Sequence, residues 1–272
     1  MPPSWRPELR RIVVLSAILA IGLSSCSTPG LRSAVPPART LTVFAAASLT
    51  QALEQIGHDF EAQNPGLHIA FNFAGSQALR MQIEQGAPVD VFASASPADM
   101  DAVITAGNAD ASAVQPFVTN VLQVILPASN PAGIEKLEDL GRPGLKLVVA
   151  APDVPVGRYA RQALGQMDKQ FGAGFSQRVL ANVVSQEDNV KQVVAKVELG
   201  EADAGIVYIS DAVAAPDLKT IEIPPELNVS ATYVIAPMKA AHDAQLAEEF
   251  VAYTRSDAAQ RIFAKWGFSP IP

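Results

Sequence analysis

The chain has 272 residues, with 20 Lys and Arg against 27 Asp and Glu, which gives a formal charge of −7. This acidic balance argues against a nucleic-acid-binding protein, because binding to phosphate requires basic patches. Hydrophobic residues make up 49% of the chain and charged residues 17%, so a substantial core can form and global disorder is excluded. A single cysteine excludes an internal disulfide and a cysteine-based metal cluster, and three scattered histidines do not favour a metal site.

Residues 1–25 have the pattern of a secretory signal peptide. A basic start precedes an apolar stretch over residues 12–23, which is shorter than the roughly 20 apolar residues that span a bilayer. The stretch ends at Leu-Ser-Ser-Cys26, which resembles the lipobox of bacterial lipoproteins, so we expect Cys26 to be acylated and to begin the mature chain. The alternative is a buried thiol, but no strand or helix pattern follows directly. Residues 26–40 predict a tether, and the protein is expected to be lipid-anchored on the extracytoplasmic side of the membrane.

From Leu41 onward, apolar runs typical of strands alternate with segments of helical periodicity. Such alternation predicts parallel α/β sheets, in which ligands bind beyond the carboxyl ends of strands and beside helix N-termini. Ser48 and Gln51 match a capping box. The predicted strands cover residues 41–46, 67–73, 89–93, 117–126, 145–150, 204–208, 220–223 and 232–236, and the predicted helices 48–60, 76–85, 97–105, 156–167, 189–199, 242–254 and 257–265.

The junctions that follow these strands carry small and neutral residues, with hydroxyl groups at Ser48, Ser76 and Tyr208. Lys and Arg do not recur there. Helix N-termini bind anions through unpaired N–H groups without a cationic side chain, and a serine hydroxyl can add a further donor. The pattern therefore favours a compact oxyanion held by neutral donors. Each residue also has a structural alternative, because Ser48, Ser76 and Asn189 are favoured helix caps and Tyr208 suits a core position.

Several of these junctions lie in segments that resemble the molybdate-binding proteins of bacterial ABC transporters. The resemblance extends in order from Leu41 to Phe268. It implies a two-lobed periplasmic-binding-protein fold of type II, in which each lobe is a mostly parallel sheet flanked by helices and a tetrahedral oxyanion lies in the cleft between the lobes. The segments that carry it are residues 43–49 (VFAAASL), 86–92 (GAPVDVF), 154–160 (VPVGRYA), 202–208 (ADAGIVY) and 265–268 (KWGF).

By motif, the resemblance implies six residues that bind the oxyanion. Side-chain hydroxyls and backbone N–H groups would hold it. Val156 stands where alanine is common in the family, a change of little consequence because only its N–H group is needed. The six residues are Ser48, Ser76, Ala95, Val156, Val190 and Tyr208.

The same resemblance implies lobe one over residues 41–120 and 233–272, and lobe two over residues 121–232, with crossings near 119–121 and 231–234. The implied function is the capture of molybdate, and also tungstate, for an importer made of a permease and its ATPase. The protein would be a monomer without a cofactor and not an enzyme, and molybdenum would be bound as the oxyanion rather than as a protein-ligated metal.

Two alternatives come from the same residues. Another tetrahedral oxyanion such as sulfate shares the charge and shape of molybdate. A secreted serine hydrolase could use Ser48 or Ser76, but it would require a Gly-x-Ser-x-Gly turn and a histidine partner, and neither serine has that context.

Overall fold

The structure is a computed structural model, and it describes residues 39–271. The predicted signal peptide, Cys26 and the tether as far as residue 38 lie outside the described residues. In the part of the chain that is described, no helix is long and apolar enough to cross a membrane.

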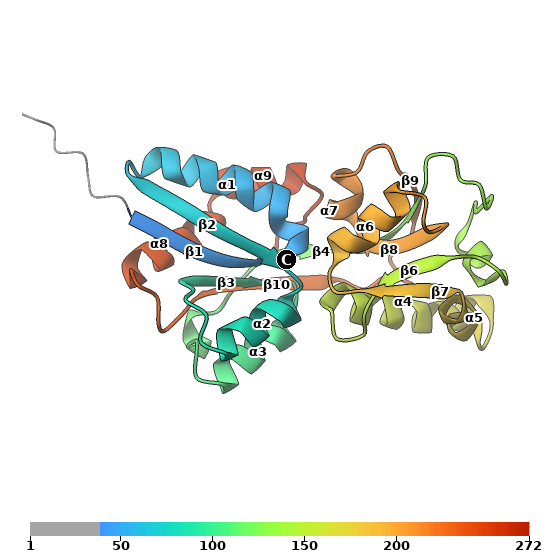
Figure 1. Cartoon of the computed structure of the whole chain (residues 1–272), viewed down its shortest axis with the longest axis horizontal. Helices are drawn as coiled ribbons and strands as arrows, with labels where there is room; N and C mark the ends of the chain where they lie inside the picture. Colours follow the sequence, from blue (N-terminus) through green and yellow to red (C-terminus); the bar gives the residue numbers. More distant parts are fainter. Residues whose placement is uncertain (1–38, 272) are drawn as a thin grey trace, which may run out of the picture. The chain divides into compact units, whose positions relative to one another are not determined.

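The first sheet has the strand order β2-β1-β3-β10-β4 (Figure 1). Strands β1, β2 and β3 are parallel, and β10 runs antiparallel to its neighbours β3 and β4. The strands are β1 (Arg39–Ala46), β2 (Leu67–Ala74), β3 (Val91–Ser94), β4 (Gln115–Asn120) and β10 (Ala231–Pro237). Strand β1 therefore includes Arg39 and Thr40, which the sequence analysis assigned to the tether; Thr40 is paired with His68 of β2.

Helices cover both faces of this sheet. Helices α1, α8 and α9 bury apolar side chains in one core, whereas α2 and α3 pack in a second core against Phe44 and Phe92. Figure 1 shows α1 and α9 on the opposite side of the sheet from α2 and α3. The helices are α1 (Thr50–Gln63), α2 (Ser76–Glu84), α3 (Pro97–Thr105), α8 (Ala244–Thr254) and α9 (Asp257–Lys265), with short 3-10 turns η1 (Ala47–Leu49) and η2 (Ala111–Ala113).

The second sheet repeats this plan, with the order β7-β6-β8-β5-β9. Strands β6, β7 and β8 are parallel, and β5 is antiparallel to β8 and β9. Its strands are β5 (Leu122–Leu126), β6 (Leu147–Ala150), β7 (Val183–Glu187), β8 (Ala204–Tyr208) and β9 (Lys219–Glu222). Its helices are α4 (Pro155–Phe171), α5 (Phe175–Ala181), α6 (Val190–Glu198) and α7 (Ile209–Val213), with the 3-10 turn η3 (Leu137–Gly141).

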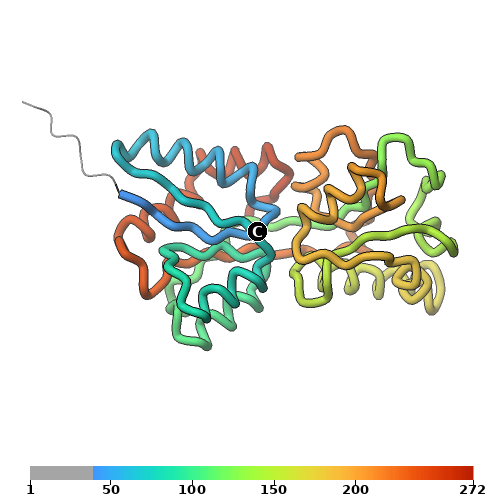
Figure 2. The backbone as a smooth tube through the Cα atoms, in the orientation of Figure 1, coloured from blue at the N-terminus to red at the C-terminus, as the bar shows by residue number. Residues whose placement is uncertain are grey.

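The chain passes twice between the two sheets, as the tube in Figure 2 shows. The first crossing is at Val121, between β4 and β5, and the second lies between β9 and β10 over residues 223–230. Asn228 joins the crossings, because its side chain accepts the N–H of Leu122 at 2.9 Å and donates to the carbonyl of Leu122 at 2.9 Å. We refer below to the first sheet with its helices as lobe one and to the second as lobe two.

The prediction of one strand over residues 117–126 is wrong, because this run is two strands in different sheets. Asn120 separates them: its Oδ1 accepts the N–H of Val121, and its Nδ2 donates to Ser210 of lobe two. Apolar residues continue on both sides of Thr119 and Asn120, so hydropathy alone does not separate two strands, although the crossing implied near 119–121 lies at this break. The sequence analysis also missed α5, α7 and β7. Helices α5 and α7 have seven and five residues, and β7 is an edge strand with alternating exposure.

Candidate functional site

The six residues expected to bind an oxyanion all line one pocket, which lies between the two lobes. The pocket has about 220 Å³ of empty space including the solvent at its mouth, and its enclosed part, about 10 Å³, is close to the size of one water molecule. Each of the six residues is buried. The remaining lining residues are Ala46, Ala47, Ala74, Gly75, Val154, Pro155 and Asn189. A pocket of this size, lined by both lobes, suits a solute of a few atoms.

Three helices begin at the pocket. Helix α2 follows Gly75, α4 follows Val154, and α6 follows Asn189, whose side chain accepts the N–H of Gln192 as a helix cap. The first N–H groups of a helix have no partner within it, and they carry a partial positive charge. The amides of Val156 and Val190 belong to these first turns. The pocket therefore offers backbone donors from lobe two at Val156 and Val190, and the first turn of α2 adds a helix N-terminus from lobe one.

Both serine hydroxyls already accept or share a hydrogen bond within the protein. Ser76 Oγ accepts the N–H of Ala95 at 3.0 Å, and Ser48 Oγ lies 2.8 Å from the hydroxyl of Tyr233. When Tyr233 donates, each serine keeps its own proton for another acceptor. The predicted capping box at Ser48 is wrong: α1 starts after Leu49 without a side-chain cap, and Ser48 lies in η1.

Tyr208 ends β8 and contributes a hydroxyl to the pocket. Its side chain is fully buried, and its hydroxyl has no hydrogen-bond partner among the described residues. Burial raises the pKa of Tyr208 well above its ordinary value, with a further contribution from neighbouring Tyr233. The phenol is therefore neutral and able to donate. A buried donor without a partner is costly, and a ligand oxygen would satisfy it.

In the described part of the chain, the residues that line the pocket include no charged side chain, but two cations lie close to lining residues in sequence. Lys191 follows Val190, and its ammonium lies 3.2 Å from the buried carboxylate of Asp211. Burial raises the pKa of Asp211, against the lowering effect of Lys191. Arg158 lies two residues after Val156 and pairs with Asp99 at 2.9 Å. The sequence analysis missed both cations, although their place beside pocket residues was a usable signal.

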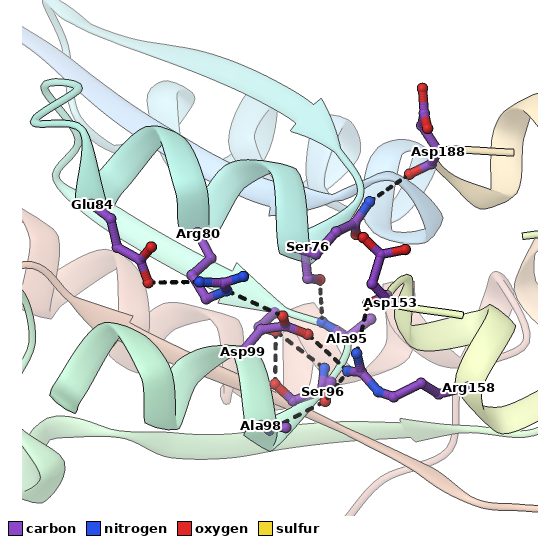
Figure 3. A network of polar contacts seen from close by, with 12 residues as sticks. Ser76, Arg80, Glu84, Ala95, Ser96, Ala98, Asp99, Asp153, Arg158 and Asp188 are labelled. Carbon is purple, nitrogen blue, oxygen red and sulfur yellow. Dashed lines mark hydrogen bonds and ion pairs between the residues drawn. The ribbon is translucent and has the colours of Figure 1, made fainter. Parts of the chain in front are cut away.

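Several hydrogen bonds join the lobes around the pocket. Gln77 of α2 donates to the carbonyl of Asp188 at 2.8 Å, and Lys191 donates to Gln51 of α1 at 2.9 Å. Arg158 of α4 donates to Ser96 at 2.9 Å and to Asp99 at 2.9 Å (Figure 3). The lobes are therefore in contact on more than one side of the pocket.

The residues that a hydrolase would need are not assembled at the serines. The hydrogen-bond partners of Ser48 and Ser76 are a tyrosine and a backbone amide. His58 and His68 are largely exposed, with side-chain exposures of 83% and 74%. Among residues 39–271, no group of three or more His, Cys, Asp and Glu side chains is placed to hold a metal ion.

Two α/β lobes, joined by two crossings and sharing a small pocket of neutral donors, define a bilobal solute-binding protein. The chain belongs to the family of bacterial extracellular solute-binding proteins, whose family model matches residues 41–269.

Known relatives agree with this assignment. The molybdate-binding protein ModA of Mycobacterium tuberculosis is 41% identical over 94% of this chain and 96% of its own length. ModA of Haemophilus influenzae is 34% identical over 88% of this chain and 94% of its own length. The solved periplasmic molybdate-binding protein of Azotobacter vinelandii is 22% identical, with a TM-score of 0.75 over 85% of this chain and 99% of that one. The expected two-lobed fold is confirmed.

Proposed function

We propose that this chain binds molybdate, and tungstate as a near-isosteric second ligand, and delivers it to the permease and ATPase of an ABC importer. The observation that carries the proposal is the pocket itself, in which the hydroxyls of Ser48, Ser76 and Tyr208 converge with the first turns of α4 and α6. Its similarity to two ModA proteins supports molybdate as the ligand.

The six predicted residues have distinct roles in this proposal. The three hydroxyls donate to oxyanion oxygens, and so do the N–H groups of Val156 and Val190. Ala95 acts through Ser76, because the N–H of Ala95 donates to Ser76 Oγ. The hydroxyl proton of Ser76 then points away from Ala95 and is free to bond to the anion. Lobe one supplies Ser48, Ser76 and Ala95, and lobe two supplies Val156, Val190 and Tyr208.

The donor set also accounts for a preference among anions. Among residues 39–271, the pocket lining includes no carboxylate that could accept a proton from the ligand. A fully deprotonated oxyanion therefore suits the pocket, whereas a protonated phosphate would place an O–H group against donors. Sulfate has the charge and shape of molybdate, so selection between the two rests on the size of the closed pocket.

Titration calorimetry with molybdate, tungstate, sulfate and phosphate tests the proposal. We expect tight binding of molybdate and tungstate and much weaker binding of sulfate and phosphate. Thermal unfolding gives an independent measure, since a ligand at 100 times its Kd stabilises the folded state by about 2.7 kcal/mol. If sulfate bound at least as tightly as molybdate, sulfate would be identified as the ligand in place of molybdate. If none of the four anions bound, the proposal would be rejected.

The proposal places the mature chain outside the cytoplasm as a monomer, attached to the membrane through an acylated Cys26. The lobes that close on the anion would be residues 41–120 with 233–272 and residues 121–232, except that Ala231 and Thr232 go with lobe one because they belong to β10. Replacing Cys26 with Ala should release the chain from the membrane fraction or leave it unprocessed. Native chain recovered in the soluble fraction with residues 1–25 still attached would contradict the anchor.

A further inference from the structure

An ionic cluster at the edge of the pocket joins the two lobes. Arg158, on α4 of lobe two, donates from Nη2 to Ser96 Oγ and to Asp99 Oδ2, both at 2.9 Å and both in lobe one. The carboxylate of Asp99 is almost fully buried, with 6% of its side chain exposed. Arg80, from the same lobe as Asp99, lies 3.6 Å from the other carboxylate oxygen. Figure 3 shows the two arginines on either side of Asp99.

Arg158 is also fixed to its own lobe. Its Nη1 donates to the carbonyl of Asp153 at 2.6 Å, in the turn that leads into α4. The guanidinium therefore bridges a turn of lobe two and the start of α3 in lobe one. Arginine suits such a bridge because its several N–H donors lie in one rigid plane and can bond to different acceptors at once.

In each lobe, a residue of this bridge lies close in sequence to a residue that lines the pocket. Arg158 lies two residues after Val156, and Ser96 directly follows Ala95. Any movement that brings Val156 and Ser76, to which Ala95 is bonded, to a shared ligand therefore brings the guanidinium to Ser96 and Asp99. Arg158 itself does not line the pocket.

We infer that Arg158 is a positioning residue that holds the two lobes together over the bound anion without touching it. The inference rests on the proposed function, because it assigns to Arg158 a share of the affinity for the oxyanion. A bond that exists only when the lobes are in contact shifts the equilibrium toward that state, and it raises the apparent affinity of a ligand that requires it. Loss of the bond should therefore appear as faster release of the anion.

The same cluster explains how the lobes can separate again. A buried carboxylate left without a partner is strongly destabilising. Asp99 avoids this state because Arg80 stays beside it within lobe one. Arg158 is about one third exposed even in the closed arrangement, so water can solvate it once the lobes part. Opening thus breaks one ion pair and leaves no isolated buried charge.

The test compares Arg158→Gln with Arg158→Lys and with the control Arg80→Gln, each in the full chain purified in detergent. Arg80 contacts the same carboxylate and pairs with Glu84 without leaving lobe one, so its replacement reports on the effect of charge within that lobe. Calorimetry gives the affinities for molybdate and tungstate, and stopped-flow fluorescence gives the dissociation rates. Thermal unfolding of the unliganded protein checks that each variant is folded.

Arg158→Gln should weaken molybdate binding about tenfold, the low end of what a hydrogen bond to a charged group contributes, because the pair is partly exposed. Most of the loss should be in the dissociation rate. Tungstate affinity should fall by the same factor, because the ligand contacts are unchanged. Arg158→Lys should recover part of the loss, and Arg80→Gln should stay within about twofold of the parent.

Three results would overturn the inference while leaving the proposed function intact. One is parental affinity in Arg158→Gln. Another is an equal loss in Arg80→Gln, which would indicate a general effect of charge on lobe one. The third is a changed ratio of molybdate to tungstate affinity in Arg158→Gln, which would indicate contact with the anion. Failure of the parent chain to bind any oxyanion would instead reject the proposed function, and the inference with it.

Discussion

The hydroxyl of Tyr208 lacks a partner in the described part of the chain, whereas that of its neighbour Tyr233 is bonded to Ser48. The two rings pack edge to face, with centroids 5.8 Å apart. The unliganded protein thus bears the desolvation penalty of one phenol and not of the other. This difference separates the effects of the two hydroxyls on stability and on binding.

Tyr208→Phe should weaken molybdate binding about tenfold and leave the unliganded protein at least as stable as the parent, because no hydrogen bond is removed. Tyr233→Phe, the matched control, should lower stability by about 1 kcal/mol, because it removes the bond to Ser48. Calorimetry and thermal unfolding of the two variants measure both effects. Loss of stability in Tyr208→Phe would show that its hydroxyl is already bonded in the free protein.

The serine hydroxyls are expected to act as donors to the anion. Ser48→Ala and Ser76→Ala should each weaken molybdate binding by about 1–3 kcal/mol, the range for loss of a hydrogen bond to a charged partner. Stability should fall by only about 1 kcal/mol, through the loss of the bonds to Tyr233 and Ala95. Calorimetry on both variants checks this, and affinities equal to the parent would restrict the serines to a structural role.

At the scale of the element, α4 shows how a helix is held against its sheet. A Cβ on Gly157 would collide with the carbonyl oxygens of Ala150 and Ala151, where the end of β6 meets the first turn of the helix. Gly165, two turns later, is exposed and has open space around its Cα. The two glycines therefore have different roles, because only Gly157 allows the first turn of α4 to lie close to the end of β6.

Gly157→Ala should destabilise the protein by about 1–3 kcal/mol through overpacking, and it should weaken anion binding by moving the N–H of Val156. Gly165→Ala, in the same helix, should raise stability by about 0.5–1 kcal/mol and leave binding unchanged, because alanine favours a helix interior. Chemical denaturation and calorimetry test the pair. Equal effects of the two substitutions would contradict the distinction.

At the scale of the whole molecule, the two lobes come into close contact at Gly75, which has no side chain to obstruct them. Gly75 has an ordinary extended backbone, with φ −61° and ψ 138°, so alanine is allowed there. A Cβ would nevertheless collide with the carbonyl oxygen of Asp188 in the other lobe and with the side chain of Gln77. The side chain can move, but the backbone carbonyl can yield only if the lobes separate.

Gly75→Ala should therefore weaken molybdate binding at least tenfold and leave the stability of the unliganded protein nearly unchanged. Small-angle scattering should show less compaction on ligand addition than in the parent. Gly86→Ala is an unsuitable control because Gly86 has a positive φ of 86°, so Gly165→Ala serves instead. Full affinity in Gly75→Ala would mean that the lobes need not approach this closely.

The charge distribution leads to a salt test. The six proposed binding residues are uncharged. The two cations close to them in sequence, Arg158 and Lys191, are paired with Asp99 and Asp211. Between about 0.1 and 1 M sodium chloride the Debye length falls from roughly 10 to 3 Å. Molybdate affinity, followed by calorimetry, should change less than about threefold over this range. A steep loss would mean that lysine or arginine side chains hold the anion.

The amino-acid sequence by itself determined the alternation of strands and helices, because this depends on periodicities within a few residues. Strand β8 and helices α3 and α9 lie where the pattern predicts them. The sequence also has small and hydroxyl-bearing residues at the predicted strand ends, and the six candidate residues at these ends line one pocket. Parallel strands end at the same edge of a sheet, so position after a strand was enough to gather the three residues within each lobe, whereas the six as one set were implied by the family resemblance.

Tertiary structure alone decided which partners those residues meet. Tyr233 lies 185 residues from Ser48, and Arg158 lies 59 residues from Asp99, so no local pattern could pair them. The hydropathy pattern did not divide residues 117–126 between two sheets, because both halves are largely buried and hydropathy indicates burial but not the neighbouring strand. Only the family resemblance implied a crossing near 119–121. Local periodicity depends on the chain next to a residue, whereas contact between lobes depends on how two separately folded sheets meet.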